Sequence, residues 1–202
     1  MAKRTLSRLS FQEREEKILK AALQLFSEKG YKGATTKALA RKAGINEALI
    51  YRHFSEKSEL YTAILQRKLK DTEQDFLPEL QAGLDQPFEE GLYYLAQRIV
   101  SRFKKDQPFF RMMLFSGLEN HPLSQWFLRQ RLPIPEVLKN FFLEKLGGRT
   151  EHDPEVAAKA FFGMLFHYAT ITQIFRVPDY FPQDEEGLLR DYVRIFAKGI
   201  QG

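Results

Sequence analysis

Polar side chains able to recognise another molecule are concentrated between residues 36 and 57. Hydroxyl, ammonium, amide, carboxylate, guanidinium and imidazole groups follow one another closely there, on Thr36, Lys37, Asn46, Glu47, Tyr51, Arg52, His53 and Lys57. Together they offer hydrogen-bond donors, acceptors and positive charge. The chain has 0 Cys, so thiolate nucleophiles, disulfides and cysteine-bound metals are excluded as its chemistry.

The spacing of small and apolar residues in this stretch predicts two short helices that cross at a steep angle. We expect them at residues 36–43 and 47–53, with Gly44 in the turn because glycine readily adopts a positive φ. Ala40 is the small residue at the crossing, and the angle is filled from both sides by Leu39, Ala43, Ile45 and Ile50. The pattern is typical of a helix-turn-helix, although a helical corner without any DNA role obeys the same constraints.

The second of these helices is slim enough for the major groove of DNA, where the edges of base pairs can be distinguished. Its beginning and outer face carry the residues that we predict to contact DNA, namely Asn46, Glu47, Ala48, Leu49, Tyr51, Arg52 and His53. Thr36 is predicted to cap the preceding helix, so that its hydroxyl and nearby amides hold a phosphate. Further positive charge that displaces counterions is expected from Lys37, Arg41, Lys42 and Lys57.

Positive charge is concentrated in the same part of the chain. Residues 1–57 hold 13 Lys and Arg against 6 Asp and Glu, whereas the rest holds 18 against 20. The formal net charge of +5 therefore arises from the first quarter of the chain, which suits a polyanionic partner. Lys3, Arg4 and Arg8 form a basic arm that either enters the minor groove or is a disordered tail.

The sequence around this motif resembles the DNA-binding domain of the TetR-type transcriptional regulators. The run ATTKALARKAGINEALIYRHFSEKSEL carries the resemblance, and ILKAALQLFSEKGYKGATT is similar to the family's first helix with its Phe-x-x-x-Gly-Tyr ending. The resemblance covers residues 18–60. It implies an all-α homodimer that binds a palindromic double-stranded DNA operator and, by the family default, represses transcription until a small ligand binds its C-terminal domain.

By position in the family's motif, the resemblance assigns contacts with phosphates or bases to Thr36, Lys37, Glu47, Ala48, Leu49, Tyr51, His53 and Lys57. Ala48 departs from the Gly that many members carry, and leaves a small apolar surface suited to a thymine methyl. Two assignments stay open. His53 either contacts DNA or fills the helix corner, and Glu47 either accepts from a cytosine amine or pairs with Arg52.

Beyond residue 57 the sequence predicts a larger, wholly helical part. Gly and Pro lie between the periodic segments, and no alternating strand pattern is found. After a first helix at 11–29, capped by Ser10 and Glu13 and ended by Gly30, we expect helices near 55–82, 87–105, 108–116, 122–131, 135–147, 153–176 and 183–198. The predicted domains are 1–57 for DNA binding, with a flexible basic arm at 1–10, and 58–202 for ligand binding and dimerisation.

The part after residue 57 is rich in aromatic residues, with 15 of the 18 Phe and the only Trp. They can simply form the core, or a subset can line a cavity for a bulky ligand, which the resemblance places between the middle helices. The residues that we predict for a small hydrophobic ligand are Phe103, Met113, Trp126, Phe127, Phe162, Phe166 and His167. No histidine pair has the spacing of metal ligands on a helix, so neither a metal nor a cofactor is predicted.

The last two predicted helices resemble the family's four-helix dimer interface. Gly163 and Ala169 would permit two protomers to approach closely. Apolar surface is expected from Phe162, Phe166, Leu189, Val193 and Phe196. We therefore expect a homodimer held through these helices.

Several classes of protein do not fit the sequence. The longest apolar run, residues 160–166, is too short to cross a bilayer, and no apolar stretch follows the basic N-terminus, so we expect a cytoplasmic protein without membrane contact. The Walker, GxGxxG, GxSxG and HExxH motifs are absent, so no enzyme and no catalytic residues are predicted. The alternative is a helical protein-interaction module whose helix-turn-helix does not bind DNA specifically.

Overall fold

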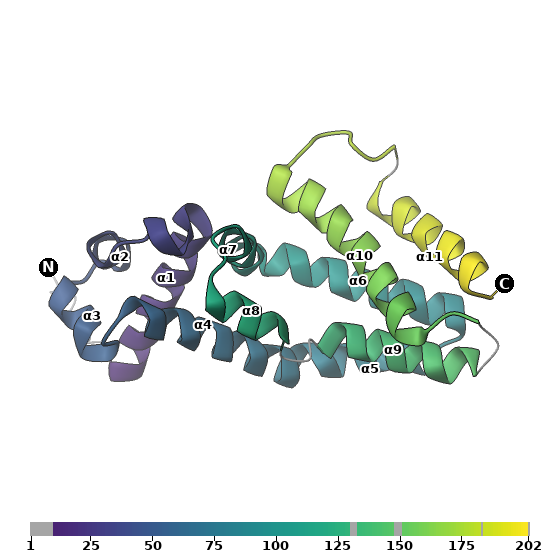
Figure 1. The fold of residues 1–202 in the computed structure, drawn as a ribbon, viewed down its shortest axis with the longest axis horizontal. Helices are drawn as coiled ribbons and strands as arrows, with labels where there is room; N and C mark the ends of the chain where they lie inside the picture. The colour runs from purple at the N-terminus through teal and green to yellow at the C-terminus, as the bar shows by residue number, and fades with distance from the viewer. Residues whose placement is uncertain (1–9, 130–132, 148–150, 183, 202) are drawn as a thin grey trace, which may run out of the picture. The chain divides into compact units, whose positions relative to one another are not determined.

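A computed structural model provides the fold, and every element in its described part is helical (Figure 1). The described residues are 10–129, 133–147, 151–182 and 184–201. No strand occurs in these ranges, which confirms the predicted all-α class. The basic arm with Lys3, Arg4 and Arg8 lies outside the described residues. Within them, no helix combines the length and the apolar character that a membrane span requires.

The chain divides into two compact units that do not follow its linear order. The first unit is Met1–Arg67 together with Pro108–Phe127, and the second is Lys68–Gln107 together with Leu128–Gly202. The first unit therefore joins the predicted helix-turn-helix to a segment that the sequence analysis placed in the C-terminal domain. The functional division at residue 57 stays a prediction, whereas the packing groups residues 108–127 with the N-terminal helices.

Helix α1 spans Phe11–Gly33 and begins at the predicted capping box. The Glu13 N–H donates to the Ser10 hydroxyl at 3.1 Å, and the Ser10 N–H donates to the Glu13 carboxylate at 2.6 Å. The regular helix ends at Gly30, which has a φ of 69°, and a further turn follows. The predicted end of the helix is thus a sharp bend that glycine adopts without strain.

The remaining helices of the first unit are shorter. Helix α2 spans Thr36–Ala43 and α3 spans Glu47–His53, which are the bounds that the sequence predicted. Helix α4 covers Lys57–Asp71, and its part up to Arg67 belongs to this unit. Helices α7, Gln107–Leu118, and α8, Pro122–Arg129, supply the segment that returns to it.

The core of the first unit forms where α1 packs against α2 and α2 packs against α3. The apolar stripe of α1 is buried there, as expected for Ile18, Ala22, Leu25 and Phe26. The residues predicted to fill the corner are buried as well, namely Leu39, Ala40, Ala43 and Ile50, while Ile45 is half-buried. Apolar packing therefore fixes the α2–α3 corner and leaves the other faces of both helices to solvent.

The predicted helix at 55–82 is a longer run with an irregular centre. It begins at Lys57 and continues through a wide turn, η1 at Thr72–Phe76, into α5 at Leu77–Leu84. The Leu77 N–H donates to the carbonyl of Thr72, five residues earlier. Pro78 explains the irregularity, because it lacks an N–H and its ring collides with the carbonyl four residues before it. The expectation of one regular helix was wrong on this point.

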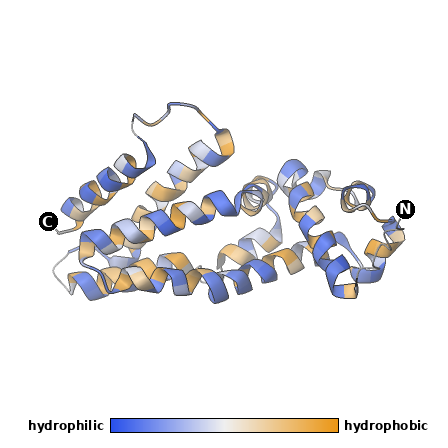
Figure 2. Cartoon of the chain, turned by 180° about the vertical axis from the view of Figure 1, so that it is seen from behind, coloured by the Kyte–Doolittle hydropathy of each residue, from blue (hydrophilic) through white to orange (hydrophobic). Residues whose placement is uncertain are grey.

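The second unit is built from longer helices around an aromatic and aliphatic core. Besides α5, these are α6 at Phe88–Lys105, α9 at Pro133–Leu146, α10 at Pro154–Ala169 with η2 at Thr170–Phe175, and α11 at Glu185–Gln201. Each carries a hydrophobic stripe along part of its surface (Figure 2). Among its largest fully buried side chains are Phe76, Leu92, Phe141, Phe142 and Phe161.

Three of the seven residues predicted to form a dimer surface on α10 and α11 are buried inside the second unit. Leu189 and Val193 are 1% and 4% exposed and belong to its core, and Ala169 is fully buried. The prediction was wrong for these three residues, because α11 packs against α6, and α10 packs against α6 and α9, within the same chain. The large apolar residues that are exposed on α10 and α11 are Val156 and Ile195.

Candidate nucleic-acid interface

A side-chain cap and a left-handed glycine set the two ends of α2. Thr35 caps this helix, since its hydroxyl accepts from the Ala38 N–H at 3.2 Å. The prediction that Thr36 is the cap was wrong by one residue, because the extended residue before the helix is Thr35, and Thr36 already lies in the first turn. Gly44 adopts the left-handed conformation, with φ 63° and ψ 40°, that the turn into α3 requires.

The residues predicted to contact DNA all lie in the first unit, and none is buried. The exposed ones are Lys37, Asn46, Ala48, Tyr51 and Arg52. The half-buried ones are Thr36, Glu47, Leu49, His53 and Lys57. Tyr51 is 52% exposed although it is large and aromatic, which suits a surface that meets a partner.

Three of these residues are joined by hydrogen bonds between α2 and α3. The Tyr51 hydroxyl donates to the Thr36 hydroxyl at 3.3 Å, and the Thr36 hydroxyl donates to the Glu47 carboxylate. The pair of Glu47 with Arg52, one of the two alternatives left open by the sequence, does not occur among the ion pairs of the described residues. Glu47 is therefore oriented by Thr36 instead of by a guanidinium.

Some polar side chains around α3 are already engaged in contacts within the chain, and others are free to bind a partner. The Asn46 side chain caps α3 by accepting from the Leu49 N–H at 2.8 Å, which leaves its amide NH₂ free to donate outward. Lys42 is paired with Glu28 at 2.8 Å. On α2 and α3, the exposed basic side chains without an ion pair in the described part of the chain are Lys37, Arg41 and Arg52.

His53 packs at the end of α3. Its ring stacks on Phe11, with centroids 4.1 Å apart and planes at 27°, and lies 6.5 Å from the ring of Phe54. Its Nδ1 atom is buried and has no hydrogen-bond partner in the described structure. These contacts favour the interpretation that His53 fills a corner of the domain.

Lys57 is the first residue of α4, and its ammonium group is occupied by the end of α1. It donates to the carbonyls of Tyr31 at 2.7 Å and Ala34 at 3.1 Å, and it lies 4.2 Å above the Tyr31 ring. Burial lowers the pKa of Lys57, and the charge of Glu119 acts in the opposite direction. Lys57 thus ties α4 to α1, and any phosphate contact would use its remaining N–H.

The sequence analysis missed a cluster that fixes the bend of α1 from the other side. The Glu119 carboxylate accepts from the N–H groups of Tyr31 at 2.9 Å and Lys32 at 3.1 Å. His121 stacks on Tyr61 at 4.9 Å and meets the edge of Tyr31 at 4.1 Å, and burial lowers its pKa. These contacts join α1 to the α7–α8 corner. They link residues about ninety positions apart, so no local signal in the sequence predicts them.

The residues predicted to bind a ligand are brought together only in part. In the second unit, the rings of Phe103, Phe162 and Phe166 lie 5.9–6.2 Å apart. His167 is exposed beside the rings of Tyr180 and Phe181. The other candidates belong to the first unit, where Phe127 is buried, Trp126 is 40% exposed and Met113 is half-buried.

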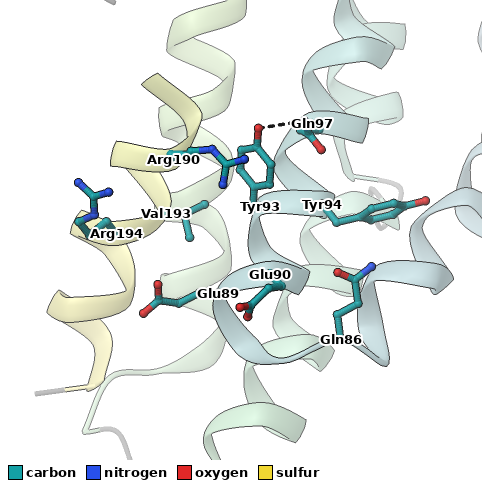
Figure 3. Close-up of a pocket in the computed structure, with 9 residues that line it drawn as sticks. All are labelled: Gln86, Glu89, Glu90, Tyr93, Tyr94, Gln97, Arg190, Val193 and Arg194. Atoms are coloured by element: carbon teal, nitrogen blue, oxygen red, sulfur yellow. Dashed lines mark hydrogen bonds between the residues drawn. The ribbon is translucent and has the colours of Figure 1, made fainter. Parts of the chain in front are cut away.

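A groove of a different character lies between α6 and α11 in the second unit (Figure 3). Its volume is about 380 Å³, and its walls are mostly polar, formed by Gln86, Glu89, Glu90, Tyr93, Tyr94, Gln97, Arg190, Val193 and Arg194. The Arg190 guanidinium lies 4.4 Å above the Tyr93 ring and is paired with Glu186 at 2.9 Å. None of the predicted ligand residues lines this groove.

Comparison with known proteins places the helix-turn-helix in its family. Residues 18–64 match the profile described as "Bacterial regulatory proteins, tetR family". The HTH-type transcriptional regulator TtgW of Pseudomonas putida is 30% identical over 123 residues, which cover 61% of this chain and 87% of TtgW. The chain belongs to the TetR family. The predicted family is thereby confirmed.

A second curated regulator matches a similar share of the chain, and a solved structure extends the likeness to the whole fold. SrpR of Pseudomonas putida, an HTH-type transcriptional regulator, is 30% identical over 61% of this chain, and the match spans about half of SrpR, 55%. The structure of FadR from Bacillus subtilis in complex with stearoyl-CoA has a TM-score of 0.68, with 17% identity over 92% of this chain and 98% of FadR. These relatives are named as regulators, so the chain is a TetR-family regulator and not an enzyme.

Proposed function

We propose that this TetR-family chain is a sequence-specific DNA-binding regulator that reads base pairs with α3 and holds phosphates with α2. The observation that carries the proposal is the outer face of α3, where Ala48, Tyr51 and Arg52 are exposed on a helix whose inner face is locked by Ile50. A seven-residue helix held at this angle fits the major groove.

Charge supports the same orientation. Lys37 and Arg41 on α2 and Arg52 on α3 are exposed without an ion pair among the described residues, so they can neutralise phosphates. Displacing counterions in this way makes affinity fall steeply as salt rises. A regulator of this kind would work in the cytoplasm, where the chromosomal DNA is.

The finer mechanism follows from the family and from the aromatic cluster of the second unit. We propose a homodimer that binds a palindromic operator, with its two reading helices roughly 34–36 Å apart. Binding of a small hydrophobic ligand would change this separation and release a repressor from DNA. Support for an apolar ligand comes from the cluster of Phe103, Phe162 and Phe166, and from the stearoyl-CoA in the related FadR structure.

A DNA-binding titration tests the central proposal. Fluorescence anisotropy with a duplex selected from the source genome should show an affinity that falls about 10³-fold or more between 50 and 200 mM salt. Lys37→Ala and Tyr51→Ala should weaken binding, whereas Lys105→Ala, an exposed lysine of the second unit, should leave it unchanged. An affinity for the duplex that changes neither with salt nor with the two substitutions would favour the protein-interaction module.

Native mass spectrometry of the purified chain tests the assembly and the ligand. A dimer that carries an additional non-covalent mass would support both parts of the mechanism and make the ligand identifiable. A monomer at micromolar concentration would contradict the proposal that the two α3 helices of a dimer bind the two halves of a palindrome. Replacing Phe103 by Ala should abolish release from DNA by that ligand while DNA affinity is retained.

A further inference from the structure

Glu47 is a negative charge placed where the proposed function puts DNA. It is the first residue of α3, is half-buried, and lies on the helix that we propose to enter the major groove. A carboxylate there has an electrostatic cost, because every phosphate nearby repels it. The N-terminus of α3 and the Thr36 hydroxyl stabilise this charge in the free protein, and a base amine would offset its cost on DNA. The following inference rests on the proposed function of α3.

The hydrogen bonds around Glu47 run in one direction. The Tyr51 O–H donates to Thr36, and the Thr36 O–H donates to Glu47, so the chain of donors ends on the carboxylate. In such a chain each bond polarises the next and strengthens it. Thr36 and Tyr51 thus hold the Glu47 side chain in one orientation, with lone pairs left over that can only accept.

The acceptor-only character of Glu47 limits what it can meet in the major groove. In the major groove guanine presents N7 and O6, and thymine presents O4 and a methyl group; none of these can donate a hydrogen bond to a carboxylate. Amino groups occur on cytosine N4 and adenine N6. In adenine the amine lies beside the N7 acceptor, a pattern that matches the paired donor and acceptor of an amide, while a carboxylate would be repelled by N7.

We propose that Glu47 specifies a cytosine in each operator half-site by accepting from its N4 amine, with Thr36 and Tyr51 as positioning residues. The structure removes the competing assignment, since Glu47 is held by Thr36 and no ion pair joins it to Arg52 among the described residues. Glu47 adds selectivity and lowers affinity for DNA in general, because its charge opposes phosphates wherever no cytosine compensates it.

Selection from a randomised duplex library, with the full-length chain, tests this proposal. When the sites enriched by the wild-type protein are aligned, each half-site should show one position occupied by cytosine, which we call the cytosine column. Changing that cytosine in a selected duplex should weaken binding by roughly five- to a hundredfold, as expected for one well-oriented base contact. With Glu47→Ala the four bases at this position should bind within about threefold of one another, and Glu47→Gln should shift the preference to adenine, which an amide pairs with.

Matched variants separate base reading from charge. Glu15→Gln on α1 removes the same charge from a half-buried glutamate outside α2 and α3, so it should raise affinity for random DNA without altering the cytosine column. Thr36→Ser keeps the donor to Glu47 and should keep the column, whereas Thr36→Val should weaken it. Circular dichroism establishes that each variant is folded before its sites are compared.

Each outcome decides the proposal. A cytosine column that persists in Glu47→Ala, or selected wild-type sites without such a column, would overturn the assignment while leaving specific DNA binding intact. If the wild-type protein enriches no sequence at all, specific DNA binding itself fails and the assignment of Glu47 fails with it. Loss of the column in Glu47→Ala, together with the adenine preference of Glu47→Gln, supports it.

Discussion

In the α2–α3 corner, capping hydrogen bonds set the ends of the short helices and small aliphatic side chains fill the angle between them, whereas the long helices of the second unit pack around aromatic rings. In the corner, Thr35 and Asn46 cap α2 and α3, and Gly44 provides the left-handed turn between them. In the second unit, Phe161 is fully buried 5.0 Å from the ring of Phe196, and Phe141 and Phe142 are equally inaccessible.

This difference explains why one region carries a recognisable motif and the other does not. Caps and left-handed turns require particular residue types at fixed offsets, so few sequences satisfy them. A core requires apolar residues of the right total volume, and many combinations provide it. Many different cores can therefore build the second unit, while the α2–α3 corner requires its particular pattern of residues.

The largest expected effect is in the core of the second unit. Phe161→Ala should lower the free energy of unfolding by about 3–5 kcal/mol, because it removes a fully buried ring and leaves a cavity. Urea denaturation followed by circular dichroism measures the change. Phe175→Ala, at a position that is 68% exposed, should change stability by about 0.5 kcal/mol or less. Equal losses for the two variants would show that buried aromatic volume does not stabilise this unit.

A smaller effect is expected where a carboxylate stabilises the bend of α1. Glu119→Ala leaves the N–H groups of Tyr31 and Lys32 without their acceptor and should cost about 2 kcal/mol, as for hydrogen bonds to a charged group. Glu119→Gln keeps an acceptor and should cost less. Glu73→Ala removes an exposed carboxylate of the second unit and serves as the control in the same denaturation measurement. A Glu119→Ala protein as stable as Glu73→Ala would contradict the role given to Glu119.

The cap of α2 offers a sharper test of the polar interactions in the corner. Thr35→Ala should cost about 1 kcal/mol and accelerate hydrogen exchange of the Ala38 amide, which the Thr35 hydroxyl now protects. Thr36→Ala should leave exchange at Ala38 unchanged, since its hydroxyl bonds to Glu47. Nuclear magnetic resonance of the two variants separates these roles. Faster exchange at Ala38 in Thr36→Ala alone would restore Thr36 as the cap.

The smallest effect concerns pH. Burial holds the pKa of His121 below its ordinary value of 6.5, so the unfolded chain takes up this proton first as the pH falls. The neutral His121 ring therefore makes its full contribution to the free energy of unfolding above pH 6.5, and this contribution is lost as the pH falls through the folded-state pKa. His121→Phe keeps an aromatic ring beside Tyr31 and Tyr61 but binds no proton, so its stability should depend less on pH.

Denaturation midpoints of both proteins between about pH 7.5 and 5 measure this difference. Glu119 and Lys57, the charged groups that act on His121, are present in both proteins, so the comparison isolates the imidazole. Identical pH profiles would show that His121 titrates alike in the folded and unfolded chain.

Local patterns of residues were sufficient to predict the helical class, the family, the bounds of α2 and α3, the capping box at Ser10 and the turn at Gly44. The family was assigned by a resemblance over residues 18–60. The other features depend on residues within a few positions of one another, where steric and hydrogen-bonding rules act locally. Because these rules act locally, the error at the α2–α3 corner was small: the cap was placed at Thr36, one residue after the actual cap, Thr35.

Which apolar faces are covered, and which distant polar groups meet, depended on the packing of the helices. That packing placed Leu189 and Val193 of α11 in the core of their own unit, and it brought Glu119 to the backbone of Tyr31. It also aimed the Thr36 hydroxyl at Glu47 across the corner. An apolar stripe or a carboxylate in the sequence does not specify which neighbour it will meet, because that neighbour is chosen by contacts between segments far apart in the chain.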